Sequence, residues 1–127
     1  MGISIQQAAT RLGISRYALR YYEKEGIIPP VTRDGHGNRC YTDSDMQWLE
    51  LVCCFRDTGM PLNDVKRIVV LSRADNSEEN LPERLAILER HRDIVTAKIE
   101  EMQRHLRKIE KKIGYYRSPG TSPHTCE

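Results

Sequence analysis

The fold is decided by residues 15–26, which read SRYALRYYEKEG. Ser15 is a residue type that commonly caps the start of a helix, and Gly26 readily adopts the left-handed backbone that ends one. We therefore expect a short helix over residues 16–24, anchored from below by Leu19. The rest of this helix is rich in arginine and tyrosine, a composition that favours contact with nucleic acid over a purely structural role.

A similar signal precedes this segment. Ser4 and Gln7 form a capping-box pattern, and Gly13 is placed to end a helix that runs to about Leu12. Two short helices joined by a brief turn that contains glycine are typical of a helix-turn-helix. On these residues alone, a plain helical hairpin remains the alternative.

Residues 28–41 interrupt the helical pattern with prolines and glycines. Asp34-Gly35 is a hairpin-type turn signal, so we expect a small β-hairpin that forms a wing. The wing would carry Arg33, Asn38, Arg39 and Tyr41. Although the whole chain has a net charge of only +2, residues 11–41 hold six basic and three acidic side chains. This local excess of positive charge suits a polyanionic partner.

The remaining chain predicts three more helices. One begins at Thr42 or Asp43 and ends at Gly59, and a second covers about residues 62–72. We expect a DNA-binding domain over residues 1–73, a polar linker over 74–80 that ends in the helix cap Asn80, a long helix over 81–116, and a disordered tail over 117–127. Apolar residues recur along the long helix in steps of three and four, which predicts a coiled-coil dimer interface. Its members are Leu85, Leu88, Val95, Ile99, Met102, Leu106, Ile109 and Ile113, followed by Tyr116, with Arg92 in the one polar slot.

Several classes of protein are disfavoured. The chain has no apolar run long enough for a membrane span and no signal-peptide pattern, so we expect a cytoplasmic protein with no membrane partner. The four histidines lie on a loop, a charged helix and the tail, without the paired carboxylates or nucleophiles that catalysis requires. We therefore expect no enzyme activity and no cofactor.

Three ordered motifs over residues 3 to about 116 resemble the MerR family of transcription regulators. ALRYYEKEGIIP at residues 18–29 resembles the family's recognition helix, and GNRCY at residues 37–41 resembles its wing motif. In that motif Asn38 and Cys40 replace the family's usual Tyr and Arg. FRDTGM at residues 55–60 resembles the junction between the third and fourth helices.

The resemblance implies a mainly α fold, with a winged helix-turn-helix followed by a long helix that forms an antiparallel coiled coil in a homodimer. Such regulators bind promoter DNA with an overlong spacer and distort it, so that RNA polymerase is affected indirectly through the promoter. Contacts with bases and phosphates are then expected from Arg16, Tyr17, Arg20, Tyr21, Tyr22, Arg33, Arg39 and Tyr41.

The effector is suggested by residues 46–56, MQWLELVCCFR, which resemble the NmlR/AdhR branch that responds to aldehydes and other electrophiles. The resemblance implies a sensing thiol at Cys54, with an inert buried thiol as the alternative. Cys53 falls on the apolar stripe and is expected in the core. Cys40 is a weaker candidate. No metal site is expected, because the tail offers only His124 and Cys126, and two ligands are too few for a closed site.

Other functions remain open from the sequence. One is a metal- or small-ligand-responsive regulator of the same family. Another is an architectural, excisionase-like DNA-binding protein, which the long heptad helix disfavours. A coiled-coil adaptor without DNA is disfavoured by the basic, tyrosine-rich helix.

Overall fold

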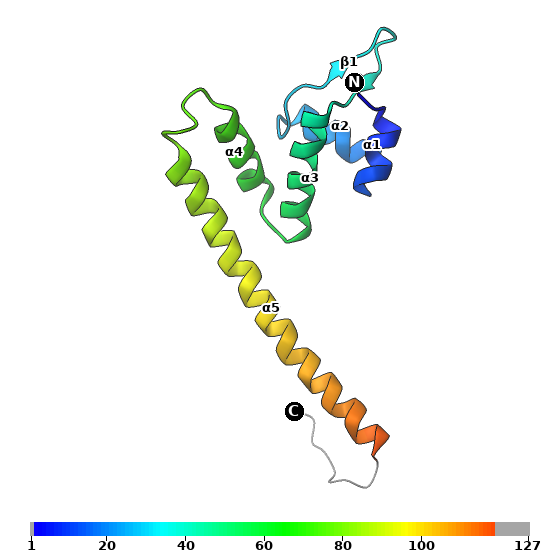
Figure 1. Cartoon of the computed structure of the whole chain (residues 1–127), viewed down its shortest axis with the longest axis vertical. Helices are drawn as coiled ribbons and strands as arrows, with labels where there is room; N and C mark the ends of the chain where they lie inside the picture. Colours follow the sequence, from blue (N-terminus) through cyan, green and yellow to red (C-terminus); the bar gives the residue numbers. More distant parts are fainter. Residues whose placement is uncertain (1, 119–127) are drawn as a thin grey trace. The chain divides into compact units, whose positions relative to one another are not determined.

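The computed structural model describes residues 2–118 and confirms a mainly helical chain with one small hairpin (Figure 1). The chain divides after Ile87 into two compact units. The first contains α1 (Ile5–Leu12), α2 (Arg16–Lys24), β1 (Thr32–Arg33), β2 (Arg39–Cys40), α3 (Asp43–Asp57), α4 (Leu62–Arg73) and the first turns of α5 (Leu81–Arg117).

Local capping sets the helix boundaries, as the sequence predicts. Ser4 accepts a hydrogen bond from the backbone of Gln7, whose side chain returns one to the backbone of Ser4. Gly13 follows α1 with φ of +69°, and Ser15 caps α2 by accepting from the backbone N–H of Ala18. These caps satisfy amides that the first turn of a helix leaves without partners.

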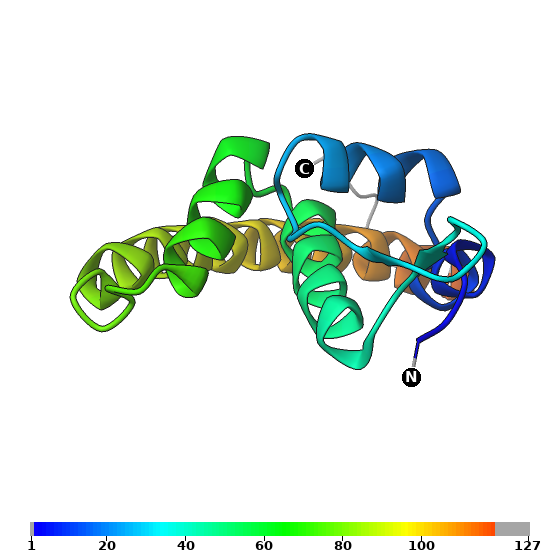
Figure 2. The ribbon, with the colours of Figure 1, turned by 90° about the horizontal axis from the view of Figure 1, so that it is seen from above.

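The core of the first unit is built where its helices meet. Leu19 of α2 is fully buried and belongs to the same apolar cluster as Leu49 and Val52 of α3 and Val65 of α4. Figure 2 shows α2 running across α3. The core therefore fixes α2 from one side only and leaves its opposite face exposed.

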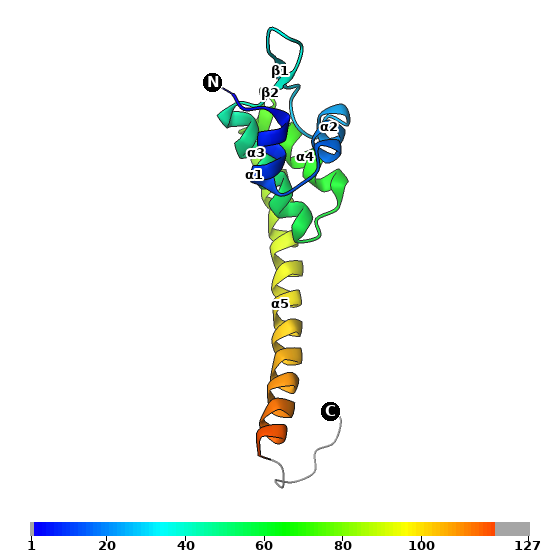
Figure 3. The same ribbon diagram turned by 90° about the vertical axis from the view of Figure 1, so that its right-hand side faces the viewer.

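The wing is joined to the N-terminal segment, beside which it lies in Figure 3. β1 and β2 pair in antiparallel fashion, with Thr32 opposite Cys40 and Arg33 opposite Arg39. Ile3 and Tyr41 then exchange two backbone hydrogen bonds, each 2.8 Å long. This isolated bridge continues the pairing beyond the hairpin and ties the base of the wing to the start of α1.

The junction of α4 and α5 differs from the expectation for Asn80. Its side-chain amide donates to the carbonyl of Leu71 at 2.9 Å, and its side-chain oxygen accepts from Nε of Arg84 at 2.7 Å. Asn80 is buried, so its side chain joins two helices instead of capping one. Ile87 is buried in the core as well, which makes the first turns of α5 part of the first unit.

The second unit is the rest of α5, which continues without a break to Arg117, one residue beyond the predicted end. Most of its large apolar residues are exposed, whereas Val95 is half-buried. Arg117, predicted to begin the disordered tail, is helical, and residues 119–127, which include His124 and Cys126, lie outside those described. No helix among the described residues is both long enough and apolar enough to cross a membrane.

Candidate DNA-binding interface

The exposed face of α2 carries the first group of predicted contact residues. Arg16 and Arg20 lie one helical turn apart, as do Tyr17 and Tyr21, so the four side chains share a surface. All four are exposed, and Tyr17 is exposed to 77%. No described carboxylate forms an ion pair with either arginine. The face thus presents two positive charges and two phenol rings to solvent.

Tyr22 points the other way, toward α3. Its ring is half-buried and packs against the core. Burial and the nearby Cys53 raise the pKa of the Tyr22 hydroxyl, although Arg56 opposes the shift. Tyr22 therefore helps to seat the helix on α3, and its predicted contact with DNA stays a prediction.

Tyr41 corrects one prediction. Its side chain is 1% exposed and lies in the core, where burial raises the pKa of its hydroxyl. No described group forms a hydrogen bond with that hydroxyl. Successive residues of an extended segment point to opposite sides, so the position after Cys40 turns inward. Tyr41 is consequently a core residue, and the expectation that it grips a phosphate from the wing surface is wrong for this conformation.

The tip of the wing is ordered by Asp34. One of its carboxylate oxygens accepts from the backbone N–H groups of His36 and Asn38, at 2.8 and 3.0 Å. The left-handed turn residue is Gly37, with φ of +81°, and its carbonyl accepts from Nη1 of Arg33 at 3.2 Å. Arg33 remains exposed. Because one carboxylate accepts hydrogen bonds from two backbone amides, this short hairpin has a defined shape.

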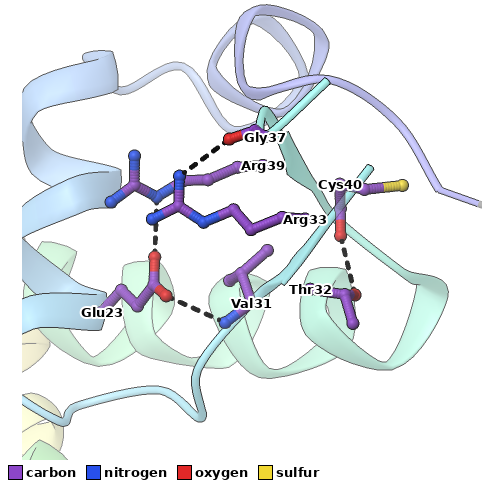
Figure 4. Close-up of polar contacts among 7 residues, drawn as sticks. All are labelled: Glu23, Val31, Thr32, Arg33, Gly37, Arg39 and Cys40. Carbon is purple, nitrogen blue, oxygen red and sulfur yellow. Dashed lines mark hydrogen bonds and ion pairs between the residues drawn. The ribbon is translucent and has the colours of Figure 1, made fainter. Parts of the chain in front are cut away.

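Glu23 joins the wing to α2 (Figure 4). Its Oε1 accepts from Nε of Arg39 at 2.7 Å, and its Oε2 accepts from the backbone N–H of Val31 at 3.0 Å. Glu23 and Arg39 are only 14% and 20% exposed. Burial alone would raise the pKa of Glu23, but the hydrogen bonds from Arg39 and Val31 hold that pKa below its ordinary value. Arg39 is thereby held through Nε while the rest of its guanidinium extends along α2 (Figure 4).

The role of Glu23 is not apparent in the sequence, where this residue counts only as a negative charge against the local basic excess. The signal that could have revealed it is an acidic residue on the face of α2 next to the wing, which holds two of the chain's arginines. Sequence separation hid the pairing, because Glu23 and Arg39 are 16 residues apart.

The cysteines occupy different environments. Cys54 is exposed on α3, while Cys53 and Cys40 are half-buried. Burial, reinforced by Asp57 and Glu50, raises the pKa of the Cys53 thiol and so disfavours its reactive thiolate. Within residues 2–118, no three side chains of the His, Cys, Asp and Glu types come together as a metal site would require.

The predicted interface along α5 is a largely exposed apolar stripe, in which Val95 is half-buried. The side chains of Leu85, Leu88, Ile99, Met102, Leu106, Ile109, Ile113 and Tyr116 are between 38% and 67% exposed. Ile99, Met102, Leu106 and Ile109 line one apolar groove together with Gln103 and His105. Such a contiguous apolar surface on a charged helix is typical of a helix that associates with a partner.

Comparison with known proteins agrees with this geometry. The chain matches the family described as "MerR HTH family regulatory protein" over residues 3–70 and the one described as "MerR, DNA binding" over residues 46–113. It is 40% identical to an uncharacterised HTH-type transcriptional regulator of Haemophilus influenzae, over 91% of this chain and 84% of that protein. It is also 40% identical to the regulator AdhR of Bacillus subtilis, over 47% of this chain and 43% of that protein.

Among solved structures, the fold resembles that of HiNmlR, a MerR family regulator lacking the sensor domain and bound to promoter DNA. The TM-score is 0.78 and the identity 41%, over 92% of this chain and 91% of that one. These relatives are regulators of transcription, not enzymes. The matches cover the helix-turn-helix, the wing and most of α5. The chain is therefore a member of the MerR family of DNA-binding transcription regulators.

Proposed function

We propose that this regulator binds promoter DNA as a homodimer, with α2 in the major groove and the wing on the adjacent backbone. The observation that carries the proposal is the exposed arginine and tyrosine face of α2 beside a wing that Glu23 holds in place. In this arrangement Arg16, Tyr17, Arg20 and Tyr21 contact bases and phosphates, and Arg33 and Arg39 contact phosphates. The accessible part of the half-buried Tyr22 contacts the DNA backbone at the edge of this surface.

Dimerisation through α5 follows from its apolar stripe. At about 1.5 Å per residue, this helix is roughly 55 Å long, and the stripe extends over most of that length. A second copy presents a matching stripe, so an antiparallel coiled coil would bury both. The dimer then carries two DNA-binding heads at a separation set by the coiled coil.

Two heads at a fixed separation can act on the shape of a promoter. We propose that the dimer binds an overlong spacer and bends and underwinds it, so that RNA polymerase engages both promoter elements. The protein supplies deformation energy and need not touch the polymerase. As a promoter-binding regulator it would act in the cytoplasm.

We further propose that Cys54 senses electrophiles. Cys54 is the exposed thiol of α3, whereas the pKa of its neighbour Cys53 is raised by burial. The Cys54 thiolate would add to the carbonyl carbon of an aldehyde, and the resulting alkoxide would take a proton from water, giving a hemithioacetal with no leaving group. The adduct would add volume and polarity to the exposed surface of α3, and we propose that this change shifts the heads on the DNA.

Transcription from purified components tests the proposal. On the protein's own upstream promoter with its natural spacer, transcription should depend on the protein. With the spacer shortened to the usual promoter length, transcription should become independent of it. A promoter that still needs the protein after shortening would contradict activation by distortion. The absence of a DNase footprint on the natural promoter would contradict the proposed binding to this promoter.

A further inference from the structure

The C-terminal half of α5 carries a strong local charge. Between residues 102 and 117 there are six basic side chains and one acidic one, a net charge of +5, whereas residues 81–101 hold four basic and five acidic ones. Four of the basic residues are one or two helical turns apart, namely Arg104, Arg107, Lys108 and Lys111. We call these four residues the basic face. All of them are exposed.

The basic face lies away from the apolar stripe. Arg104 is two residues from both Met102 and Leu106, which places it about 160° from each around the helix, and Lys111 has the same relation to Ile109 and Ile113. Arg107 and Lys108 fill the positions between them on the outer side. In a coiled coil built on the stripe, these are positions that do not touch the partner helix. The second copy therefore cannot neutralise them.

Two structural explanations for these charges fail. No described carboxylate forms an ion pair with any of the four, although Glu110 lies among them. Instead they repel one another, since like charges three and four residues apart are unfavourable on a helix. The helix dipole favours cations only in the last turn, and Lys111 precedes the end of α5 at Arg117 by six residues.

We propose that the basic face is a second DNA-contacting surface, which binds the phosphate backbone of duplex DNA without reading its sequence. This inference rests on the proposed dimer, because the dimer places both basic faces on the outside. The face contains no apolar or aromatic side chain. A protein partner would normally find an apolar centre surrounded by polar residues, whereas sequence-independent binding to phosphates needs only lysine and arginine.

The test compares the whole protein with a variant that carries Arg104→Gln, Arg107→Gln, Lys108→Gln and Lys111→Gln. Glutamine has about the helix propensity of lysine and arginine, so α5 should persist, which circular dichroism checks. Affinity is measured against salt concentration on two operator duplexes, one covering only the site of the two heads and one extended on both sides. Lys98→Gln removes a positive charge from α5 outside the face and is the control for loss of charge from this helix.

On the extended duplex, the fourfold variant should have a shallower dependence of log affinity on log salt, by about 0.9 for each phosphate that the variant no longer neutralises. Lys98→Gln should leave that slope unchanged. If the phosphates belong to a second duplex instead, operator-bound protein should capture a labelled unrelated duplex, and the fourfold variant should not. Either result supports the proposal and identifies the source of the phosphates.

Unchanged slopes on both duplexes and unchanged capture would overturn the proposal. If the same variant then kept its affinity for DNA but lost activation of transcription by RNA polymerase, the basic face would bind an acidic surface of another protein. Failure of the dimer is detected separately, by sedimentation of the unmodified chain. Even in that case, binding of the two proteins to unrelated duplex still tests the face itself.

Discussion

Glu23 of α2 and Arg39 of β2 form an ion pair with 2.7 Å between Oε1 and Nε, and the other oxygen of Glu23 accepts the backbone N–H of Val31. One carboxylate therefore holds the residue before β1 and the first residue of β2 against the helix proposed to enter the major groove. The ion pair thus fixes the distance between α2 and the wing in the free protein, which reduces the conformational entropy lost when the protein binds DNA.

Replacing Glu23 should uncouple the wing from α2. Glu23→Ala removes two hydrogen bonds to a charged acceptor, so we expect the free energy of unfolding to fall by about 2 kcal/mol and operator binding to weaken. Urea denaturation and fluorescence anisotropy measure the two effects. Glu25→Ala, at the exposed end of the same helix, is the matched control and should change neither.

The same pair predicts a pH dependence. The folded protein holds the pKa of Glu23 below its ordinary value of about 4.5. A lowered pKa in the folded state stabilises above the ordinary value, and this stabilisation disappears as the pH falls through the folded-state pKa. The stability difference between the natural chain and Glu23→Gln should therefore be constant near neutral pH and shrink below about pH 4.5. A difference that grew on acidification would contradict this sign.

The coiled coil can be tested by placing charges on α5. Ile99→Asp together with Leu106→Asp should give monomers in sedimentation, because an unpaired charge is costly in a buried seam. Ala97→Asp is the control, since Ala97 lies two residues from both Val95 and Ile99 and faces outward. A dimer that survived the double substitution would place the interface elsewhere.

Binding to phosphates by α2 and the wing has its own signature. Alanine at Arg16, Arg20 and Arg39 together should flatten the salt dependence of operator affinity by about one unit for each phosphate that these arginines bind. Arg73→Ala, at the exposed end of α4, should leave the slope as it is. The assignment is wrong if the triple variant keeps the natural slope at reduced affinity.

The proposed thiol sensor predicts different reactivities for the two adjacent cysteines, Cys53 and Cys54. Mass spectrometry after brief treatment with an aldehyde or quinone should detect an adduct on Cys54 before Cys53, because Cys54 is exposed and the pKa of Cys53 is raised. Cys54→Ser should keep operator affinity and lose induction, while Cys53→Ser should keep both. Normal induction in Cys54→Ser would favour a ligand that binds without a covalent bond.

Local sequence signals made the helix boundaries predictable, whereas the side-chain directions that depend on long-range pairing could not be predicted. Ser4, Gly13 and Ser15 form their capping hydrogen bonds with residues within about one helical turn. Their positions alone therefore indicate where α1 begins and ends and where α2 begins. Tyr41, which points inward, is paired instead with Ile3, which lies far earlier in the sequence.

Asn80 illustrates the same limit. Its position before a long helix predicted a cap, but its partners are Leu71, nine residues earlier, and the side chain of Arg84. A residue type that suits a cap also suits a buried junction, because the same amide can donate to one helix and accept from another. Only the packing of α4 on α5 decides between the two roles.

The bridge between Ile3 and Tyr41 makes residues 4–40 a loop that is closed at its base by two peptide groups. That loop contains α1, α2 and the wing. When the bridge is closed, fraying of any one of them is restrained by the other two, so they should open and close as one cooperative unit in hydrogen exchange. Because the Ile3–Tyr41 bridge consists of backbone hydrogen bonds, substitutions of either side chain should change its stability without removing the hydrogen bonds themselves.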